Sequence, residues 1–188
     1  MPIVELHVLQ GYEPQEKLRL HKALTDAIRL VVPAPPEAIT VLIHELKGED
    51  YSRGGVHRQG AAALPDAGDL VRAYLSAMEA RDLERAQSML STDFVMEFPG
   101  TGPLRTLDEL IAWAKPRYRF VKKTYDGFDV MQSREAATVV YCRGTLSGEW
   151  PDGDSFDGIR FIDRFEVVAG KITRQDVWND IAEVKATA

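Results

Sequence analysis

The chain of 188 residues has a single cysteine, Cys142, no long apolar run and no cluster of basic residues. One cysteine cannot form an internal disulfide, which indicates a reducing compartment such as the cytoplasm. No apolar stretch approaches the roughly 20 residues that a membrane-spanning helix needs, and the N-terminus lacks the pattern of a signal peptide. We therefore expect a cytoplasmic protein with no membrane partner.

Positive charge is also scarce, because 23 basic residues stand against 29 acidic ones and the formal net charge is −6. Such a chain repels a phosphate backbone, so we expect no nucleic acid partner. The four histidines are scattered without the spacing of metal ligands, and we expect no metal site. They are His7, His21, His44 and His57.

Hydrophobic residues make up 45% of the chain, which is ordinary for a globular protein. A stretch of small residues, glycine and proline near residues 54–68 has neither helical nor strand periodicity. We place a linker at residues 59–66. It separates a first domain, residues 1–58, from a second domain, residues 67–188.

The first domain has the pattern of a strand, a helix and a second strand. Branched apolar residues at 3–9 and 39–46 are typical of strands, and Pro14 suits the first turn of a helix between them. This order predicts a right-handed βαβ unit with parallel strands. Two parallel strands leave two open edges and a small core, so we expect the unit to complete itself by forming an oligomer.

The second domain begins with helical patterns near residues 67–81 and 83–90 and, after a strand, a third helix that starts near Thr106. Thr106 and Glu109 have the spacing of a capping box. Four strand-like segments follow from residue 123 onward, separated by glycine-containing turns. Helices followed by a run of strands predict an α+β fold, with three helices against a curved antiparallel sheet.

Residues 1–58 resemble the 4-oxalocrotonate tautomerase family, through the Met-Pro-Ile start, the strand-Gly-helix-strand layout and the Tyr51-Ser-Arg-Gly-Gly ending. The resemblance implies that Pro2, once the initiator methionine is removed, acts as a general base or nucleophile. A free secondary amine in an apolar pocket is pushed toward its neutral form and can accept protons. Where family members bind substrate carboxylates with arginines, this chain has Tyr12 and Thr40. Tyr51 matches the family's aromatic pocket residue. Arg53 is expected to supply a cation in place of the family's arginines.

Residues 67–184 resemble the SnoaL-type polyketide cyclases and the wider nuclear-transport-factor-like fold. The resemblance is carried by Tyr74-Leu-Ser-Ala-Met-Glu-Ala-Arg-Asp-Leu, by Phe94-Val-Met-Glu-Phe-Pro-Gly and by Ile162-Asp-Arg-Phe-Glu-Val-Val. It implies a cone-shaped α+β barrel, in which a bent sheet wraps around three helices and an apolar pocket opens at the mouth.

The ketosteroid isomerases share that fold and imply roles for individual residues. Tyr74 and Asp163 match their two oxyanion-hole donors, whereas Phe98 occupies the position of their catalytic base. We expect Phe98, Trp113 and Trp178 to line the pocket.

Asp163 is also singled out by the strand pattern, because every other residue from Ile159 to Val167 is apolar except this acid. A carboxyl group on such a face is paired, metal-bound or held neutral by its surroundings. Arg143 is the expected partner if the group is ionised.

Both resemblances imply chemistry at the carbon next to a carbonyl group. The leading hypothesis is a cofactor-independent isomerase, tautomerase or cyclase that abstracts a proton and stabilises an enolate on a small apolar carbonyl substrate, such as a polyketide. The alternatives are a hydrolase or dehydratase in the same pocket, or a non-catalytic ligand-binding or assembly module. The expected assembly is a homo-oligomer, a trimer or hexamer through the first domain with dimer contacts through the second.

Overall fold

The computed structural model describes residues 1–133 and 135–187, so Arg134 and Ala188 of the expected second domain lie outside the described residues. The chain divides into two compact units, Met1–Ala63 and Leu64–Ala188. Residues 58–66 carry no regular secondary structure. No helix among the described residues combines the length and the apolar character that a bilayer crossing requires.

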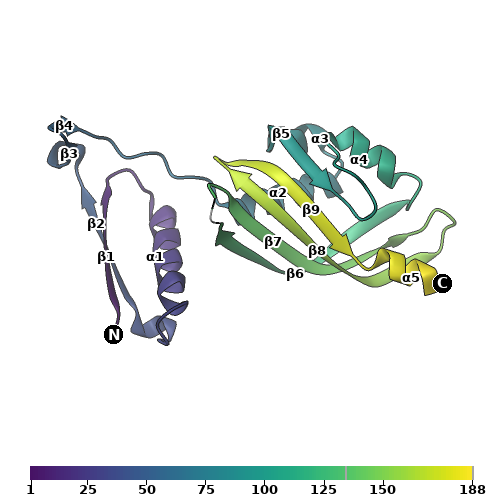
Figure 1. Cartoon of the computed structure of the whole chain (residues 1–188), viewed down its shortest axis with the longest axis horizontal. Helices are drawn as coiled ribbons and strands as arrows, with labels where there is room; N and C mark the ends of the chain where they lie inside the picture. The colour runs from purple at the N-terminus through teal and green to yellow at the C-terminus, as the bar shows by residue number, and fades with distance from the viewer. Residues whose placement is uncertain (134, 188) are drawn as a thin grey trace. The chain divides into compact units, whose positions relative to one another are not determined.

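The first unit is a βαβ element (Figure 1). Strand β1, Ile3–Leu9, pairs in parallel with strand β2, Thr40–Leu46, and helix α1, Pro14–Arg29, connects them along one face of the pair. The helix begins as the sequence predicts, with Pro14 in its first turn, and the backbone amide of Glu13 donates to the Glu16 carboxylate. These residues confirm the predicted strand, helix and strand.

A short hairpin follows β2 and was not predicted as such. Strands β3, Ser52–Arg53, and β4, Val56–His57, are antiparallel and joined by Gly54 and Gly55. Both glycines have positive φ values, 58° and 74°. A two-residue turn with this geometry strongly favours glycine, and it matches the twist of the two strands.

The first unit has no interior of its own. Residues 1–63 are all described, and none of them is buried. Large apolar side chains that point to solvent include Ile3, Leu30, Val31 and Leu42. Because hydrophobic burial is the main favourable term in folding, this unit lacks most of that stabilisation as a single copy.

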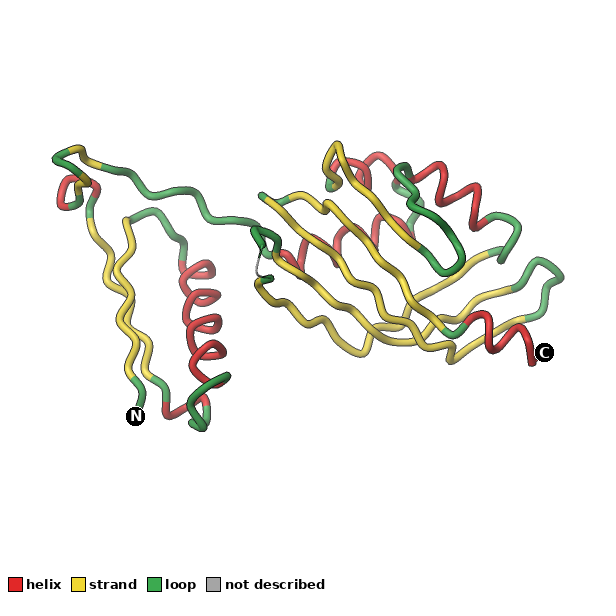
Figure 2. Tube along the Cα trace, viewed as in Figure 1, coloured by secondary structure: helices red, strands yellow, loops and turns green. Residues whose placement is uncertain are grey.

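The second unit is a curved five-stranded sheet with helices packed on one face (Figure 2). The strand order is β5-β9-β8-β7-β6. The strands are β5, Leu90–Glu97; β6, Phe120–Gln132; β7, Thr138–Glu149; β8, Ser155–Val168; and β9, Lys171–Asn179. The helices are α2, Ala67–Glu79; α3, Leu83–Ser88; α4, Leu107–Ala114; and α5, Ile181–Thr187.

Two features of this unit differ from the expectation. The sheet is antiparallel except at one edge, where β5 pairs with β9 in parallel. Helix α5 is a fourth helix that the strand-rich C-terminal pattern did not indicate. The predicted capping box is present, since the backbone amide of Glu109 donates to the Thr106 hydroxyl and Glu109 accepts from the amide of Thr106.

The core of the second unit lies between the helices and the sheet face that they cover. Strand β8 alternates as its sequence predicts, with one set of side chains buried and the other half-buried or exposed. The buried set of β8 includes Ile159, Phe161, Asp163, Phe165 and Val167. Tyr74 and Val71 of α2 and Leu107 and Leu110 of α4 belong to the same buried cluster.

Gly144 of β7 lies so close to β6 that a side chain cannot be added without moving the backbone, because a Cβ atom would collide with the Thr124 carbonyl. We expect Gly144→Ala to lower the free energy of unfolding by about 3 kcal/mol, at the upper end for overpacking. Urea unfolding measures this effect. Gly102→Ala is the control, since its Cβ would meet nothing within 4 Å. Equal stability of the two variants would contradict the expectation.

Candidate functional site

A cavity of about 280 Å³ opens in the second unit, and its walls are mostly apolar. Helices α2 and α4 and strands β6 and β9 supply its lining. The polar and ionisable side chains of the wall include Tyr74 and Glu79 of α2, Lys123 and Tyr125 of β6 and Gln175 of β9.

Lys123 is held at this wall by a buried acid. The Lys123 ammonium is hydrogen-bonded to Oδ2 of Asp163, whose side chain has no exposed surface, while the Lys123 side chain is 20% exposed. The Lys123 nitrogen also lies 4.4 Å from the ring centre of Phe161. A carboxylate in such surroundings is costly unless it is paired, and Lys123 provides the pairing charge.

Tyr74 and Gln175 connect to the same acid. The Tyr74 hydroxyl donates to Oε1 of Gln175 at 3.3 Å, and Nε2 of Gln175 donates to Oδ2 of Asp163 at 3.4 Å. Burial, with a smaller contribution from the charge of Asp163, raises the pKa of Tyr74 far above that of free tyrosine. Tyr74 is therefore a neutral donor that orients Gln175 and, through it, the acid.

The other oxygen of the acid, Oδ1, is buried and has no hydrogen-bond partner among the described residues. Cys142 lies opposite Asp163 in the β7–β8 register. Burial, and then the charge of Asp163, raises the pKa of the Cys142 thiol to about 12. The thiol therefore stays protonated near neutral pH and packs as an apolar group.

Tyr125 and Glu79 are two further polar residues of the cavity wall. Burial raises the pKa of Tyr125, so its hydroxyl also stays neutral. Glu79 lines the cavity and is exposed, and in the described part of the chain it forms no ion pair. A carboxylate with this freedom can accept a proton from a molecule that occupies the cavity.

The aromatic residues singled out from the sequence fall into different places. Phe98 lines the cavity, as expected. Trp113 lies behind it, with ring centres 5.2 Å apart, and lines a neighbouring cavity that Arg117 and Tyr118 also border. Trp178 does not belong to the cavity, because it is 52% exposed and lies on the opposite face of β9 from Gln175. Strand alternation explains this correction.

The arginines near Asp163 have other partners. Arg143 pairs with Asp129 at 2.5 Å and not with Asp163. Arg164 pairs with Glu166 and Asp176, on the other face of β8.

The sequence-based reading of the second unit missed Lys123, Gln175 and Glu79. A signal for Lys123 exists, since alternation in β6 puts it on the half-buried face with Val121 and Tyr125.

In the first unit, a cavity of about 550 Å³ lies at the end of β1 and β2. Tyr51 and Arg53 line it together, and Nε of Arg53 donates to the Tyr51 hydroxyl at 2.8 Å. Tyr12 is not part of its lining.

Pro2 lies at the other end of β1, about 20 Å away along the strand at roughly 3.3 Å per residue. Its carbonyl accepts from the amide of Thr40 at 3.0 Å, and Met1 precedes it, so its nitrogen is an amide here. One copy of the chain therefore does not bring Pro2 to Tyr51 and Arg53.

Comparison with known proteins matches both units. Residues 2–58 match the family described as tautomerase enzyme, and residues 71–175 match the SnoaL-like domain family. A probable tautomerase of Listeria innocua is 36% identical over 58 residues, which are 31% of this chain and 95% of that protein. A probable tautomerase of Lactiplantibacillus plantarum is 38% identical over 56 residues, 30% of this chain and 88% of that protein.

Solved structures match the second unit in fold. An NTF2-like protein of unknown function from Burkholderia pseudomallei has a TM-score of 0.53 and 21% identity, covering 63% of this chain and 93% of that one. TerC, co-crystallised with polyporic acid, has a TM-score of 0.52 and 16% identity, covering 63% of this chain and 94% of that one. These similarities confirm the predicted α+β fold.

The buried ion pair can be tested by removing its cation. We expect Lys123→Met to lower the free energy of unfolding by about 3–5 kcal/mol, because it leaves the Asp163 charge buried without a partner. Adding Asp163→Asn removes that charge and should restore much of the loss. Urea unfolding measures both variants.

Arg143→Met is the matched control, since it breaks an exposed pair on the neighbouring strand. It should cost no more than about 1 kcal/mol. A Lys123→Met variant as stable as Arg143→Met would show that the buried pair does not hold the site.

Proposed function

Because the chain belongs to the tautomerase family through residues 2–58 and to the SnoaL-like domain family through residues 71–175, we propose that it is an isomerase or cyclase that moves a proton next to a carbonyl group. The single observation that carries this proposal is the Lys123–Asp163 pair in the wall of a largely apolar cavity. The pair holds the ammonium group of Lys123 at a fixed place in that wall.

Lys123 is the enolate-stabilising group in this mechanism. When a C–H bond beside a carbonyl loses its proton, the electron pair moves to the carbonyl oxygen, and an ammonium group already in place stabilises the new negative charge. Asp163 orients Lys123, and Gln175 and Tyr74 hold Asp163 through the hydrogen bonds described above. Tyr125 offers a second neutral hydroxyl donor in the same cavity.

Glu79 is the proton acceptor that replaces the acid absent at Phe98. Its carboxylate takes the proton from the substrate carbon and becomes a neutral acid. Returning that proton to a different carbon completes an isomerisation. Attack of the carbanion on a second carbonyl of the same molecule, with the proton passing to the new alkoxide, completes a cyclisation. Neither route requires a cofactor.

The substrate class follows from the walls of the cavity. Phe98, Leu110 and Ile111 provide apolar contacts, and the polar groups of the wall, which also include Arg81 and Lys122, provide charge and hydrogen bonds. A small, mostly apolar molecule with one or more carbonyl groups, such as a polyketide, fits this distribution.

The first unit can form a second catalytic site, made of Pro2, Tyr51 and Arg53, only when several copies of the chain assemble. Removal of Met1 would give Pro2 a free secondary amine, and a second copy would be needed to bring Pro2 of the partner subunit to Tyr51 and Arg53. The absence of buried residues in 1–63 supports assembly through this unit, as a trimer or a hexamer. If the second unit also forms dimer contacts, a hexamer reconciles both kinds of contact.

The proton-transfer function predicts exchange of substrate hydrogen with solvent. In deuterated water, the protein should speed deuterium uptake at the α-carbon of an enolisable ketone, followed by NMR. Glu79→Gln and the doubly substituted Lys123→Met/Asp163→Asn variant should each lower that rate by about 10²-fold, since they remove the base and the stabilising charge. Lys115→Met, an exposed cation outside the cavity lining, is the control.

If the wild-type chain binds such ketones but gives no exchange above buffer, the second unit is a binding module, which is the alternative that Phe98 at the base position favours. If exchange is abolished by Pro2→Ala and is unaffected by Glu79→Gln, the chemistry belongs to the first unit.

Assembly is expected to be visible in solution. Light scattering at micromolar concentration should give the mass of a trimer or a hexamer, because the first unit cannot bury its apolar side chains alone. The intact mass of the same sample shows whether Met1 is absent and Pro2 is free. A stable monomer would contradict the proposed assembly.

A further inference from the structure

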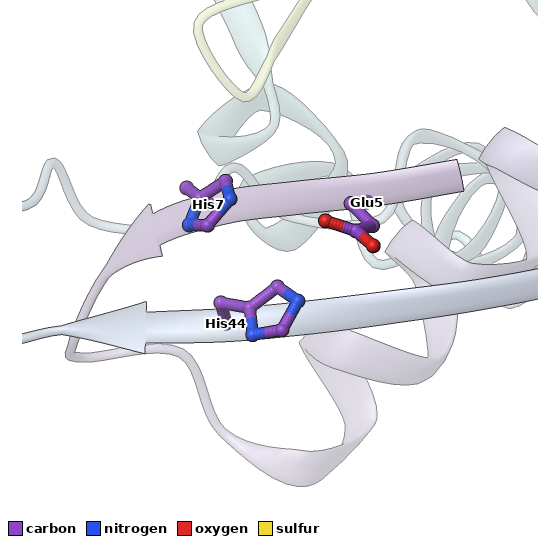
Figure 3. Close-up of side chains that lie close together, drawn as sticks. All are labelled: Glu5, His7 and His44. Carbon is purple, nitrogen blue, oxygen red and sulfur yellow. The ribbon is translucent and has the colours of Figure 1, made fainter. Parts of the chain in front are cut away.

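Three side chains that bind metals in other proteins meet on the open face of the first unit (Figure 3). Glu5 and His7 come from β1, two residues apart and on the same face, and His44 comes from β2. The parallel register pairs His7 directly with His44. Their rings are stacked with centres 4.8 Å apart and planes at 18°.

The ligand atoms of the three residues all lie within 4.8 Å of one another. A zinc ion bonds to imidazole nitrogen and carboxylate oxygen at about 2.0–2.2 Å, so two of its tetrahedral ligands lie about 3.3 Å apart. The separation here exceeds that value by at most about 1.5 Å. Rotation of exposed side chains closes such a gap without any change in the backbone.

Nothing in the described part of the chain competes for these groups. In a single copy of the chain, Glu5, His7 and His44 are exposed, and among the described residues they form no hydrogen bond or ion pair. The neighbouring acid Glu45 faces the other way and pairs with Lys17 of α1 at 2.7 Å. In a single copy, this face therefore presents two imidazoles and one carboxylate that can bind a cation, beside the apolar side chains of Ile3 and Leu42.

We propose that Glu5, His7 and His44 form a binding site for a divalent transition-metal ion such as Zn²⁺. Two imidazoles and a carboxylate are the protein ligands of one class of zinc site, in which a further position stays open for water or another ligand. The bound ion bridges β1 and β2 through their side chains, in addition to the backbone ladder. It thereby links the two strands of a unit that has no buried residues.

This proposal departs from the expectation drawn from histidine spacing alone. His7 and His44 are distant in sequence, and no local motif connects them. The register of a parallel strand pair makes them neighbours, and sequence spacing does not record that register.

Metal titration of the full-length protein tests the proposal. Chelator-treated protein is titrated with Zn²⁺ in competition with a coloured chelator, and separately with Co²⁺, whose visible absorption reports the coordination geometry. We expect one ion bound per chain at micromolar or lower dissociation constant. Binding should weaken on acidification, because protons compete for the imidazole nitrogens.

Substitutions of the ligands separate this site from adventitious binding. His7→Gln and His44→Gln should each weaken Zn²⁺ binding by at least about 100-fold, and Glu5→Gln by about 10-fold, with unchanged circular dichroism. His57→Gln, which removes an exposed histidine of β4, should leave the affinity unchanged. The proposal is overturned if the protein binds no Zn²⁺ at 100-fold excess, if His7→Gln and His44→Gln bind as wild type, or if His57→Gln weakens binding equally.

Discussion

A carboxylate without any exposed surface is the constraint on which the second unit depends. The alternation of β8 carries Asp163 into the core, and its charge has to be balanced there. Lys123, two strands away in the sheet, supplies that charge, and Gln175 adds a hydrogen bond from β9. Because Lys123 and Gln175 both lie in the wall of the cavity, the need to neutralise a core acid also determines which polar groups the cavity contains.

The two units differ in where their folding free energy comes from. The second encloses an apolar core between helices and sheet, with residues such as Phe165 and Ile172 fully buried. The first has a regular βαβ backbone and a well-capped helix, yet none of its residues is buried. Its shape is fixed by local hydrogen bonds and turn residues, while its stabilisation has to come from contacts with something else.

Much of the fold could be predicted from the sequence, because each element carries a local signal. Pro14, the Thr106–Glu109 box and the alternation around Asp163 each predict a start, a cap or a buried face correctly. The parallel β5–β9 edge was not predictable in this way, since strand order depends on contacts between distant segments.

Less of the candidate site could be predicted from the sequence, because it also depends on contacts between distant segments. The burial of Asp163 followed from its own strand. Alternation in β6 places Lys123 on the half-buried face, but that pattern does not say which acid it meets two strands away. Arg143 was the expected partner because Arg164, next to Asp163 in sequence, points to the opposite face of its strand, yet Arg143 pairs with Asp129. The exposed position of Trp178 likewise depends on which face of β9 meets the helices.

The parallel edge of the second sheet has a consequence for the order of events during synthesis. Strand β5 comes first among the strands of this unit and β9 comes last, yet they are direct neighbours. Contacts between segments so far apart in the chain form slowly, and here β5 has no partner until β9 has left the ribosome. The helices α2 and α3, made early, meanwhile present apolar faces with no sheet to cover them. The cavity between α2, β6 and β9 thus becomes complete only after β9 has been synthesised.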